Sequence, residues 1–263
     1  MNEAVRYESR GDIGVITLDR PDNRNSMTPE LLDAFVVATA AAKRDAKARV
    51  VVITGTGSCF SSGADFKSVL QRDDDGGRPT TPDERSYAMY EPFLGVLDLE
   101  VPVIAACNGH TVGGGFGLSL VCDLRIGARD AKYGANFAKL GLHPGLAISY
   151  LLPRIVGAQR AAELLFTGRL VDGDEAARLG ILLESVPADE VVSRALQLAR
   201  TIVDNAPTAL RLTKRTFYRG LGWDVRGGAR AEATPQAITL ATADAAEGIA
   251  ALLEKRAAKF TGR

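Results

Sequence analysis

Short runs of apolar, often β-branched residues alternate with longer amphipathic stretches up to about residue 186. Runs of this kind, bounded by glycine, proline and polar residues, predict buried β-strands. The pattern places strands at 4–8, 13–18, 50–54, 103–107, 124–128 and 182–186. Because helical stretches separate most of these strands, the pattern predicts an α/β fold.

Two predicted helices carry explicit start signals. Thr28 can cap a helix that begins at Pro29, a residue suited to the first helical position. The apolar positions that follow fall on one helix face: Leu31, Phe35, Ala38 and Ala42. Thr81 and Glu84 have the spacing of a capping box at the start of a second helix. The polar segment 71–80 before it is predicted to be a loop, either a lid beside a pocket or an ordinary solvated loop.

From residue 189 onward the helical pattern is almost uninterrupted. Pro207 can open one helix there, and glycines and Pro235 punctuate the stretch that follows. The chain is long enough to bury a large core. The pattern therefore divides it into an α/β core at 1–188 and a helical region at 189–263, which is expected to pack against neighbouring subunits.

Two glycine-rich turns after predicted strands suggest the chemistry. The strand at 50–54 leads to Gly63-Ala64-Asp65, and the strand at 103–107 leads to Gly113-Gly114-Gly115 before an apolar helical segment. At such a turn unpaired N–H groups converge, and the helix dipole favours negative charge. Each turn alone is also explained as a tight turn that needs glycine. Together they predict two backbone donors around one oxygen.

The order of these motifs resembles the enoyl-CoA hydratase/isomerase (crotonase) family over nearly the whole chain. Further matching motifs are Val15-Ile16-Thr17-Leu18-Asp19-Arg20-Pro21, Asn108-Gly109, Cys122-Asp123, Leu152-Pro153-Arg154 and Asp244-Ala245-Ala246-Glu247-Gly248. The resemblance implies a crotonase-like α/β fold, in which ββα repeats form a spiral core, with a C-terminal helical trimerisation region. It also implies a role in fatty acid metabolism with an acyl-CoA substrate. Because that CoA thioester is itself the substrate, no separate cofactor is expected.

The resemblance assigns roles to individual residues. The backbone N–H groups of Ala64 and Gly114 would form an oxyanion hole that stabilises the enolate of the thioester. The residues expected to line the acyl or CoA site are Arg24, Ser62, Asp65, Phe66, Lys67, Gly117, Phe137, Lys259 and Phe260. In the family the C-terminal region builds homotrimers, often paired into hexamers, and a basic–aromatic pair reaches the CoA of a neighbouring subunit. Lys259 and Phe260 match that pair, although a frayed terminus explains them equally well.

The departures from the family pattern concern the acid and the base. Two positions that carry catalytic glutamates in the hydratases hold Gly117 and Phe137, and the aspartate of other relatives is replaced by Gly145. General acid–base catalysis contributes roughly 10²–10⁴-fold per group, so standard hydration of a 2-enoyl-CoA is not expected. Isomerisation of an enoyl-CoA double bond is favoured, because it needs one proton shuttle and no positioned water. The alternative is a non-catalytic acyl-CoA binding protein.

The chain holds only two histidines as candidates for a replacement base. His143 lies in the loop after the segment of the missing second glutamate, and histidine side chains can titrate near neutral pH. The simpler interpretation of His143, and the favoured one, is a loop histidine bonded to backbone. His110 precedes the second glycine turn and is expected to be structural.

Composition sets limits on partners and location. Lys plus Arg and Asp plus Glu both total 32, so nucleic-acid binding is not indicated. No apolar run reaches the roughly 18 residues of a membrane span, and the first residues do not have the form of a secretory signal. Cys59, Cys107 and Cys122 are expected to be reduced, buried thiols of a cytoplasmic protein. Two histidines and no cysteine pairs predict no metal site.

Overall fold

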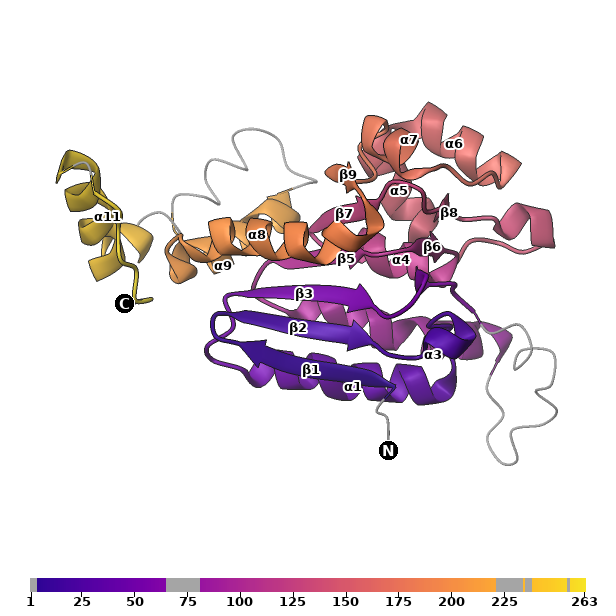
Figure 1. The fold of residues 1–263 in the computed structure, drawn as a ribbon, viewed down its shortest axis with the longest axis horizontal. Helices are drawn as coiled ribbons and strands as arrows, with labels where there is room; N and C mark the ends of the chain where they lie inside the picture. The colour runs from indigo at the N-terminus through magenta and orange to yellow at the C-terminus, as the bar shows by residue number, and fades with distance from the viewer. Residues whose placement is uncertain (1–3, 65–80, 221–233, 235–237, 255) are drawn as a thin grey trace.

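The larger of two β-sheets carries the predicted strands. The computed structural model describes residues 4–64, 81–220, 234, 238–254 and 256–263 (Figure 1). The strands of this sheet lie side by side in the order β1 (Val5–Arg10), β2 (Ile13–Leu18), β3 (Val50–Gly55), β5 (Val103–Cys107), β7 (Leu124–Ala128) and β9 (Glu184–Val186). β1 is antiparallel to β2, and the other neighbouring strands are parallel. All six predicted strands are confirmed, and their ends differ from the prediction by at most two residues.

The sequence pattern does not reveal a second, smaller sheet. It consists of the parallel strands β4 (Cys59–Ser61), β6 (His110–Val112) and β8 (Tyr133–Gly134). Strands of two or three residues are too short to show an alternation of apolar and polar positions. Each comes shortly after a strand of the larger sheet, so β3–β4, β5–β6 and β7–β8 repeat as pairs. These pairs confirm the expected ββα architecture.

The first predicted helix is confirmed as α1 (Pro29–Arg44). The Thr28 hydroxyl oxygen accepts a hydrogen bond from the Leu31 N–H at 3.2 Å, as the cap requires. α1 packs against β1 and β2 with the predicted apolar face. α3 (Pro82–Leu94) lies against α1, where the rings of Phe35 and Phe93 meet edge to face with centroids 4.8 Å apart.

The helix α4 (Gly114–Val121) is buried along its whole length. At its C-terminal end, Arg125 donates hydrogen bonds to the carbonyl groups of Ser119 and Cys122 at 3.3 and 2.7 Å. These bonds satisfy carbonyls that a helix end otherwise leaves unpaired. The remaining short elements of the core are η1 (Pro21–Asn23), η2 (Gly95–Asp98), η3 (Phe137–Leu140), α5 (Ile148–Val156), α6 (Ala158–Thr167), α7 (Gly173–Arg178) and η4 (Ala188–Glu190).

The described part of the C-terminal region contains α8 (Val191–Val203), α9 (Pro207–Gly220) and α11 (Ala243–Glu254). α8 packs against the larger sheet, and its buried face consists of Val191, Ala195, Ala199 and Val203. The first helix of this region is thus part of the core packing. Figure 1 shows α11 at one end of the molecule, beyond α9 and away from both sheets. None of the described helices is long and apolar enough to cross a bilayer.

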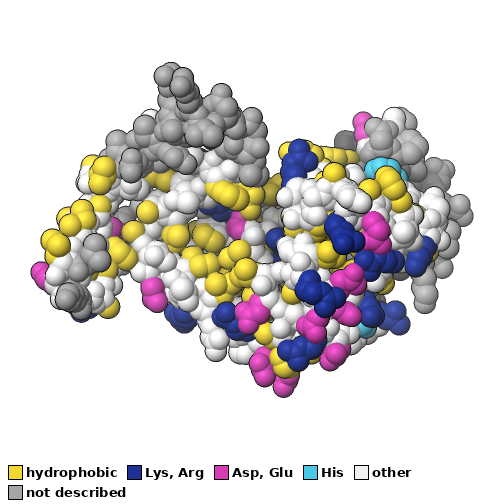
Figure 2. Space-filling model, turned by 90° about the horizontal axis from the view of Figure 1, so that it is seen from above, with side chains coloured by type: hydrophobic (Ala, Val, Ile, Leu, Met, Phe, Trp, Pro, Cys, Tyr) yellow, Lys and Arg dark blue, Asp and Glu magenta, His cyan; other side chains and the backbone are white. Residues whose placement is uncertain are grey.

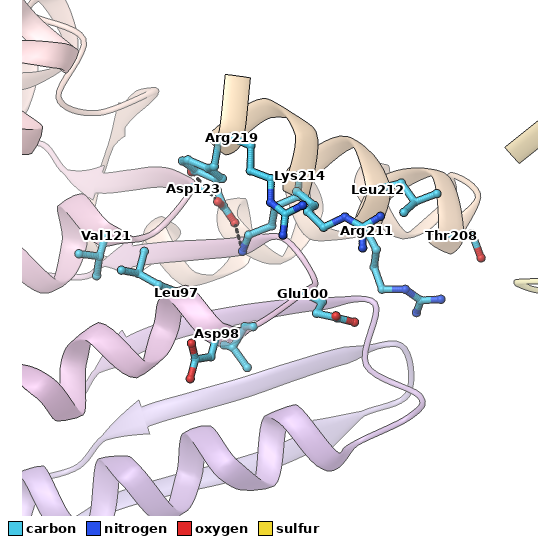
Figure 3. A pocket seen from close by; sticks show the side chains of 13 residues that line it. Leu97, Asp98, Glu100, Val121, Asp123, Thr208, Arg211, Leu212, Lys214 and Arg219 are labelled. Carbon is cyan, nitrogen blue, oxygen red and sulfur yellow. Dashed lines mark hydrogen bonds and ion pairs between the residues drawn. The ribbon is translucent and has the colours of Figure 1, made fainter. Parts of the chain in front are cut away.

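A partly buried ion pair connects α9 to the core. Lys214 Nζ lies 2.8 Å from Asp123 Oδ2, and the two side chains are only 14% and 16% exposed (Figure 3). The Lys214 ammonium also donates to the Val101 carbonyl at 2.8 Å, and the Tyr218 hydroxyl donates to Asp123 Oδ1 at 2.6 Å. Removing one partner would leave a poorly solvated charge, so this cluster holds α9 in one position.

Candidate active site

The two glycine turns lie side by side at the carboxyl ends of two strands of the smaller sheet. β4 and β6 are parallel neighbours, with Ser61 opposite Thr111. Neighbouring parallel strands run in the same direction, so the residues that follow them emerge side by side. Gly63-Ala64 and Gly113-Gly114 are therefore adjacent. A Cβ placed on Gly63 would lie only 2.6 Å from the Gly114 nitrogen.

Glycine is required on both sides of this contact. Gly63 has φ +82° and Gly113 has φ +58°, which are backbone conformations that L side chains rarely adopt. A side chain on Gly63 would also meet the Val112 carbonyl oxygen at 2.9 Å. The Gly113 N–H donates to the Gly134 carbonyl at 3.0 Å, which ties the second turn to β8. The local sequence therefore fixes the backbone that presents the next two N–H groups.

The N–H groups of Ala64 and Gly114 are available to a ligand. Gly114 is the first residue of α4, so its N–H has no partner within the helix. At the other turn the Met27 N–H bonds to the Gly63 carbonyl at 2.8 Å, which leaves the Ala64 N–H outside that contact. Among the described residues neither N–H donates a hydrogen bond. Two such donors, one of them at the start of a buried helix, favour an oxygen that carries negative charge.

The thioether of Met27 forms one wall beside these donors. A Cβ on Gly114 would lie 2.2 Å from Met27 Sδ, so any side chain at position 114 displaces the methionine. Met27 itself is 4% exposed. The donors therefore lie next to an apolar, water-poor surface, where a hydrogen bond to a charged oxygen is stronger than in water.

A tight turn before α1 supports the first donor. Arg24 and Asn25 both adopt left-handed conformations, with φ +60° and +51°. The Arg24 carbonyl accepts from the Ser62 N–H at 3.0 Å, so two predicted site residues are bonded through their backbones. The buried Asn25 side chain donates to the carbonyls of Thr56 and Cys59 at 3.0 and 2.8 Å. The exposed Arg24 guanidinium makes no ion pair with the described residues.

Neighbouring side chains fill two of the positions where carboxylates are missing. A Cβ on Gly117 would meet Leu146 Cδ2 at 2.6 Å, and a Cβ on Gly145 would meet the Tyr90 hydroxyl oxygen at 2.3 Å. The third position carries Phe137, whose ring Cζ lies 3.8 Å from where a Cβ on Gly113 would be. The wall of the site is therefore repacked with a leucine, a tyrosine and a phenylalanine.

The two histidines occupy different environments. His143 is exposed in the loop after η3, and its Nδ1 lies 2.7 Å from the Pro144 carbonyl oxygen. A carbonyl only accepts, so Nδ1 carries a proton there and Nε2 of the neutral ring remains an acceptor. His110 Nδ1 accepts from the Lys132 N–H at 3.0 Å. The contact of His110 agrees with its expected structural role, and the contact of His143 agrees with the favoured interpretation, a loop histidine bonded to backbone. The role of His143 as a base stays a prediction.

The C-terminal pair of predicted site residues, Lys259 and Phe260, does not lie at the glycine turns. Asp65, Phe66 and Lys67 lie outside the described residues. The exposed Lys259 donates its backbone N–H to the Glu247 carboxylate at 2.9 Å, and the Phe260 carbonyl accepts from Arg49 at 3.3 Å. Arg49 precedes β3, at the opposite end of that strand from the glycine turns. Within one chain, the C-terminal pair therefore lies far along the sheet from Ala64 and Gly114.

The cysteines are free and buried, as predicted. Burial raises the pKa of the Cys107 thiol to about 12, so it remains protonated and unreactive near neutral pH. Burial also raises the pKa of the Cys122 thiol. Neither cysteine is a candidate nucleophile.

The sequence does not predict that three further residues line the site: Met27, Tyr90 and Leu146. Tyr90 and Gly145 are far apart in the sequence, so no local motif connects them. Leu146 contacts Gly117 from a left-handed backbone conformation, with φ +53°. Leucine rarely adopts this conformation, so the sequence does not indicate it. The sequence offers one indication, the glycine at position 145. A glycine in place of a larger residue leaves space in a close-packed interior, so another side chain is expected to fill it.

Comparisons with known proteins point in one direction. The family model described as Enoyl-CoA hydratase/isomerase matches residues 8–263. A Thermus thermophilus relative is 36% identical over 251 residues, which cover 95% of this chain and 98% of that protein. A Clostridium acetobutylicum protein named Short-chain-enoyl-CoA hydratase is 31% identical, with 96% and 95% of the two chains covered.

Solved structures share the fold over almost the full length. The crystal structure of an enoyl-CoA hydratase from Bacillus anthracis superposes with a TM-score of 0.90 at 31% identity. The alignment covers 99% of this chain and 100% of that chain. This similarity supports the spiral architecture of paired strands and the helical C-terminal region together.

Proposed function

Because the chain belongs to the enoyl-CoA hydratase/isomerase (crotonase) family, we propose that it acts on acyl-CoA thioesters and shifts the double bond of an enoyl-CoA. The observation that carries this proposal is a pair of adjacent N–H groups, one on Ala64 after β4 and one on Gly114 at the start of the buried helix α4, that donate to none of the described residues. No separate cofactor is needed, because the thioester supplies the reactive carbonyl.

The two donors would polarise the thioester oxygen. As a base removes a proton from the acyl chain, negative charge moves onto that oxygen and an enolate forms. A preorganised donor of this kind contributes roughly 3–4 kcal/mol to the transition state. The α4 dipole adds to the effect, since its positive end faces the same oxygen. Return of the proton to a different carbon completes the isomerisation.

Hydration is not the favoured reaction of this site. It requires a water molecule that is both positioned and activated, which carboxylates accomplish in the hydratases that the chain resembles. Here Leu146 and Phe137 present hydrocarbon where those carboxylates would lie. The hydratase names of relatives at 31–36% identity describe those proteins, and identity at this level leaves room for a different acid and base.

His143 is the proposed base. Its Nδ1–H is held by the Pro144 carbonyl, which orients the ring and leaves Nε2 able to accept a proton. The loop that carries His143 also carries Gly145 and Leu146, so it borders the repacked wall. We expect His143→Gln to lower the rate of isomerisation while the affinity for acyl-CoA stays nearly unchanged. An unchanged rate would reject His143 as the base.

The second candidate function is acyl-CoA binding without catalysis. The filled carboxylate positions favour it, because binding needs the N–H donors but no acid or base. Incubation with 3-enoyl-CoA and 2-enoyl-CoA substrates separates the two candidates. Conversion of one isomer into the other, followed by chromatography, supports the isomerase. Tight binding without conversion supports the binding protein.

The oxyanion hole is tested by removing one N–H while the space is kept constant. In a Met27→Ala background, which clears the clash at position 114, Gly114→Pro removes the donor and Gly114→Ala retains it. Proline suits the first position of a helix. We expect the proline variant to lose acyl-CoA affinity and turnover relative to the alanine variant, with equal thermal stability. Equal affinity in the two variants would refute the assignment.

We also propose that 189–263 mediates assembly into a cytoplasmic homotrimer or hexamer. Several apolar side chains are exposed on the described C-terminal helices: Phe217, Leu240, Ile249 and Leu253. Figure 2 shows hydrophobic side chains gathered on the same side of the molecule. A cavity of about 420 Å³ beside α9 adds to this surface (Figure 3). A second copy of the chain is the proposed occupant. Sedimentation velocity gives the oligomeric state directly.

A further inference from the structure

The phenol of Tyr90 occupies the space of a missing side chain. A Cβ on Gly145 would lie 2.3 Å from the Tyr90 Oη, 2.4 Å from Cζ and 2.8 Å from Cε1. Gly145 is buried and does not have a positive φ, so the tyrosine ring rather than the backbone excludes a side chain there. The Tyr90 hydroxyl, carried by α3, thus lies where the aspartate side chain of other relatives would begin.

Contacts connect this hydroxyl to the oxyanion hole. Leu146, the residue after Gly145, packs on Gly117 of α4. Gly117 lies one helical turn beyond Gly114, a distance of roughly 5 Å along the axis. That distance is comparable with the length of the first few carbons of an acyl chain. A thioester held at Gly114 would therefore extend its chain toward the wall formed by Leu146 and Tyr90.

The Tyr90 hydroxyl has no partner among the described residues. Its side chain is partly buried, and no hydrogen bond from the phenol is made to the described part of the chain. The phenol is therefore available to donate to an acceptor that reaches it. Burial raises the pKa of Tyr90, so the phenol stays protonated. Next to a carbonyl oxygen, which only accepts, it acts as a hydrogen-bond donor.

We propose that Tyr90 determines specificity by donating a hydrogen bond to an oxygen on the acyl chain beyond the α-carbon. The inference rests on the proposed function, since it assumes that the thioester is held by Ala64 and Gly114. Leu146 and Phe137, which fill the neighbouring positions, offer no hydrogen bond. The site thereby binds CoA thioesters that carry a 3-oxo or 3-hydroxy group more tightly than those with a plain hydrocarbon chain. For the proposed isomerisation, it selects enoyl-CoA substrates whose acyl chain carries a further oxygen. A site built around one such donor discriminates against analogues that lack the acceptor.

The test compares two ligands of equal chain length, acetoacetyl-CoA and butyryl-CoA, by titration calorimetry. Removal of one hydrogen bond in Tyr90→Phe should weaken acetoacetyl-CoA binding by roughly tenfold. Butyryl-CoA affinity should change less than twofold, because the ring still fills the space beside Gly145. The selectivity ratio is a readout that a purely structural role of Tyr90 would not move.

Two further variants complete the test. Gly145→Ala leaves Tyr90 in the chain but pushes its ring aside, and it should reduce the preference for acetoacetyl-CoA as Tyr90→Phe does. Tyr150→Phe removes the hydroxyl of an exposed tyrosine whose ring lies under the Arg154 guanidinium, and it should have no effect. If Gly145→Ala does not fold, the Tyr90→Phe comparison decides alone.

The outcomes separate this inference from the function on which it rests. An unchanged selectivity ratio in Tyr90→Phe, or an equal loss for both ligands, overturns the role of Tyr90 but leaves acyl-CoA binding intact. If the unmodified protein binds neither thioester, the proposed function itself fails. Loss of the acetoacetyl-CoA preference with retained butyryl-CoA binding supports both.

Discussion

At the scale of single residues, the site is built from pairs in which a glycine leaves space and a neighbour takes it. Leu146 packs over Gly117, and Tyr90 packs over Gly145. Leu146 is followed by Ala147, and both adopt left-handed conformations with φ +53° and +55°. Conformations of this kind cost of order 1–3 kcal/mol each and persist where surrounding contacts impose them. The space that the missing carboxylates would occupy is therefore filled by other side chains. A single substitution cannot restore a carboxylate there, because the neighbouring side chain would also have to move.

The first prediction concerns that wall. Gly117→Glu should destabilise the protein by about 2 kcal/mol or more, because its Cβ would lie 2.6 Å from Leu146 Cδ2 and the carboxylate would be buried. Adding Leu146→Ala should recover part of the loss in thermal unfolding. Hydration of crotonyl-CoA, followed by its absorbance, should rise only in the triple variant Gly117→Glu/Phe137→Glu/Leu146→Ala. Phe137→Glu/Leu146→Ala is the control and should show no gain. A Gly117→Glu protein as stable as the unmodified one would contradict this packing argument.

At the scale of elements, the sequence predicts what leaves a periodic or conformational mark. The strands of the larger sheet and α1 have long apolar patterns, and Gly63 and Gly113 mark the turns because their positive φ demands glycine. The smaller sheet leaves no such mark, because β4, β6 and β8 are held by pairing rather than by pattern. The contact of Tyr90 with Gly145 joins distant segments, so it follows only from the tertiary structure.

The second prediction concerns the turn that supports Ala64. Asn25 is fully buried, and its side chain bonds to Thr56 and Cys59 and accepts from the Arg20 N–H at 2.8 Å. Asn25→Ala leaves these backbone groups unpaired, so it should cost about 3 kcal/mol. That corresponds to a fall of roughly 6–12 °C in the unfolding midpoint. Acyl-CoA affinity should fall with it, because the turn also holds Ser62.

A neighbouring asparagine provides the matched control for that variant. The Asn23 side-chain oxygen is buried without a hydrogen-bond partner. Asn23→Ala removes the same chemical group from the same turn but breaks no side-chain hydrogen bond to the described residues. It should therefore leave the unfolding midpoint nearly unchanged. Equal losses in the two variants would show that the turn, rather than the Asn25 hydrogen bonds, is what the substitutions disturb.

The third prediction concerns the pH dependence of the C-terminal tail. A hydrogen bond from Arg256 and another from the Lys259 N–H lower the pKa of Glu247 to about 2. A carboxylate with a lowered folded-state pKa stabilises the fold above its unfolded pKa of about 4.3. The contribution is lost as the pH falls toward about 2. The midpoint difference between the unmodified protein and Glu247→Gln should thus persist from pH 7 to 5 and shrink at lower pH.

The control for the tail is Glu254→Gln. Glu254 also contacts Arg256, at 2.5 Å, but it is 61% exposed and does not bond to the backbone of Lys259. Its substitution should have the smaller effect at neutral pH. A midpoint difference for Glu247→Gln that grows on acidification would reverse the sign of the argument and reject it.

At the scale of the whole molecule, the site and the tail lie at opposite ends of the larger sheet. Ala64 and Gly114 follow β4 and β6, which come after the carboxyl ends of β3 and β5. Arg49 lies at the opposite end, before β3, and donates to the carbonyl of Phe260. α11 lies farther still from the glycine turns (Figure 1). If Lys259 and Phe260 contact CoA, the geometry favours a CoA bound to a neighbouring subunit. Such head-to-tail contacts close into a ring when identical subunits repeat them.

The last prediction tests that arrangement by mixing two defective proteins. One carries Lys259→Ala/Phe260→Ala with intact donors, and the other carries Met27→Ala/Gly114→Pro with an intact tail. If the tail serves the adjacent subunit, random assembly from equal amounts gives about a quarter of sites with both parts intact. Mixed oligomers, formed by co-expression, should then turn over enoyl-CoA faster than either parent. If each tail serves its own subunit, no site in the mixture is complete, and the rate should equal the mean of the two parents.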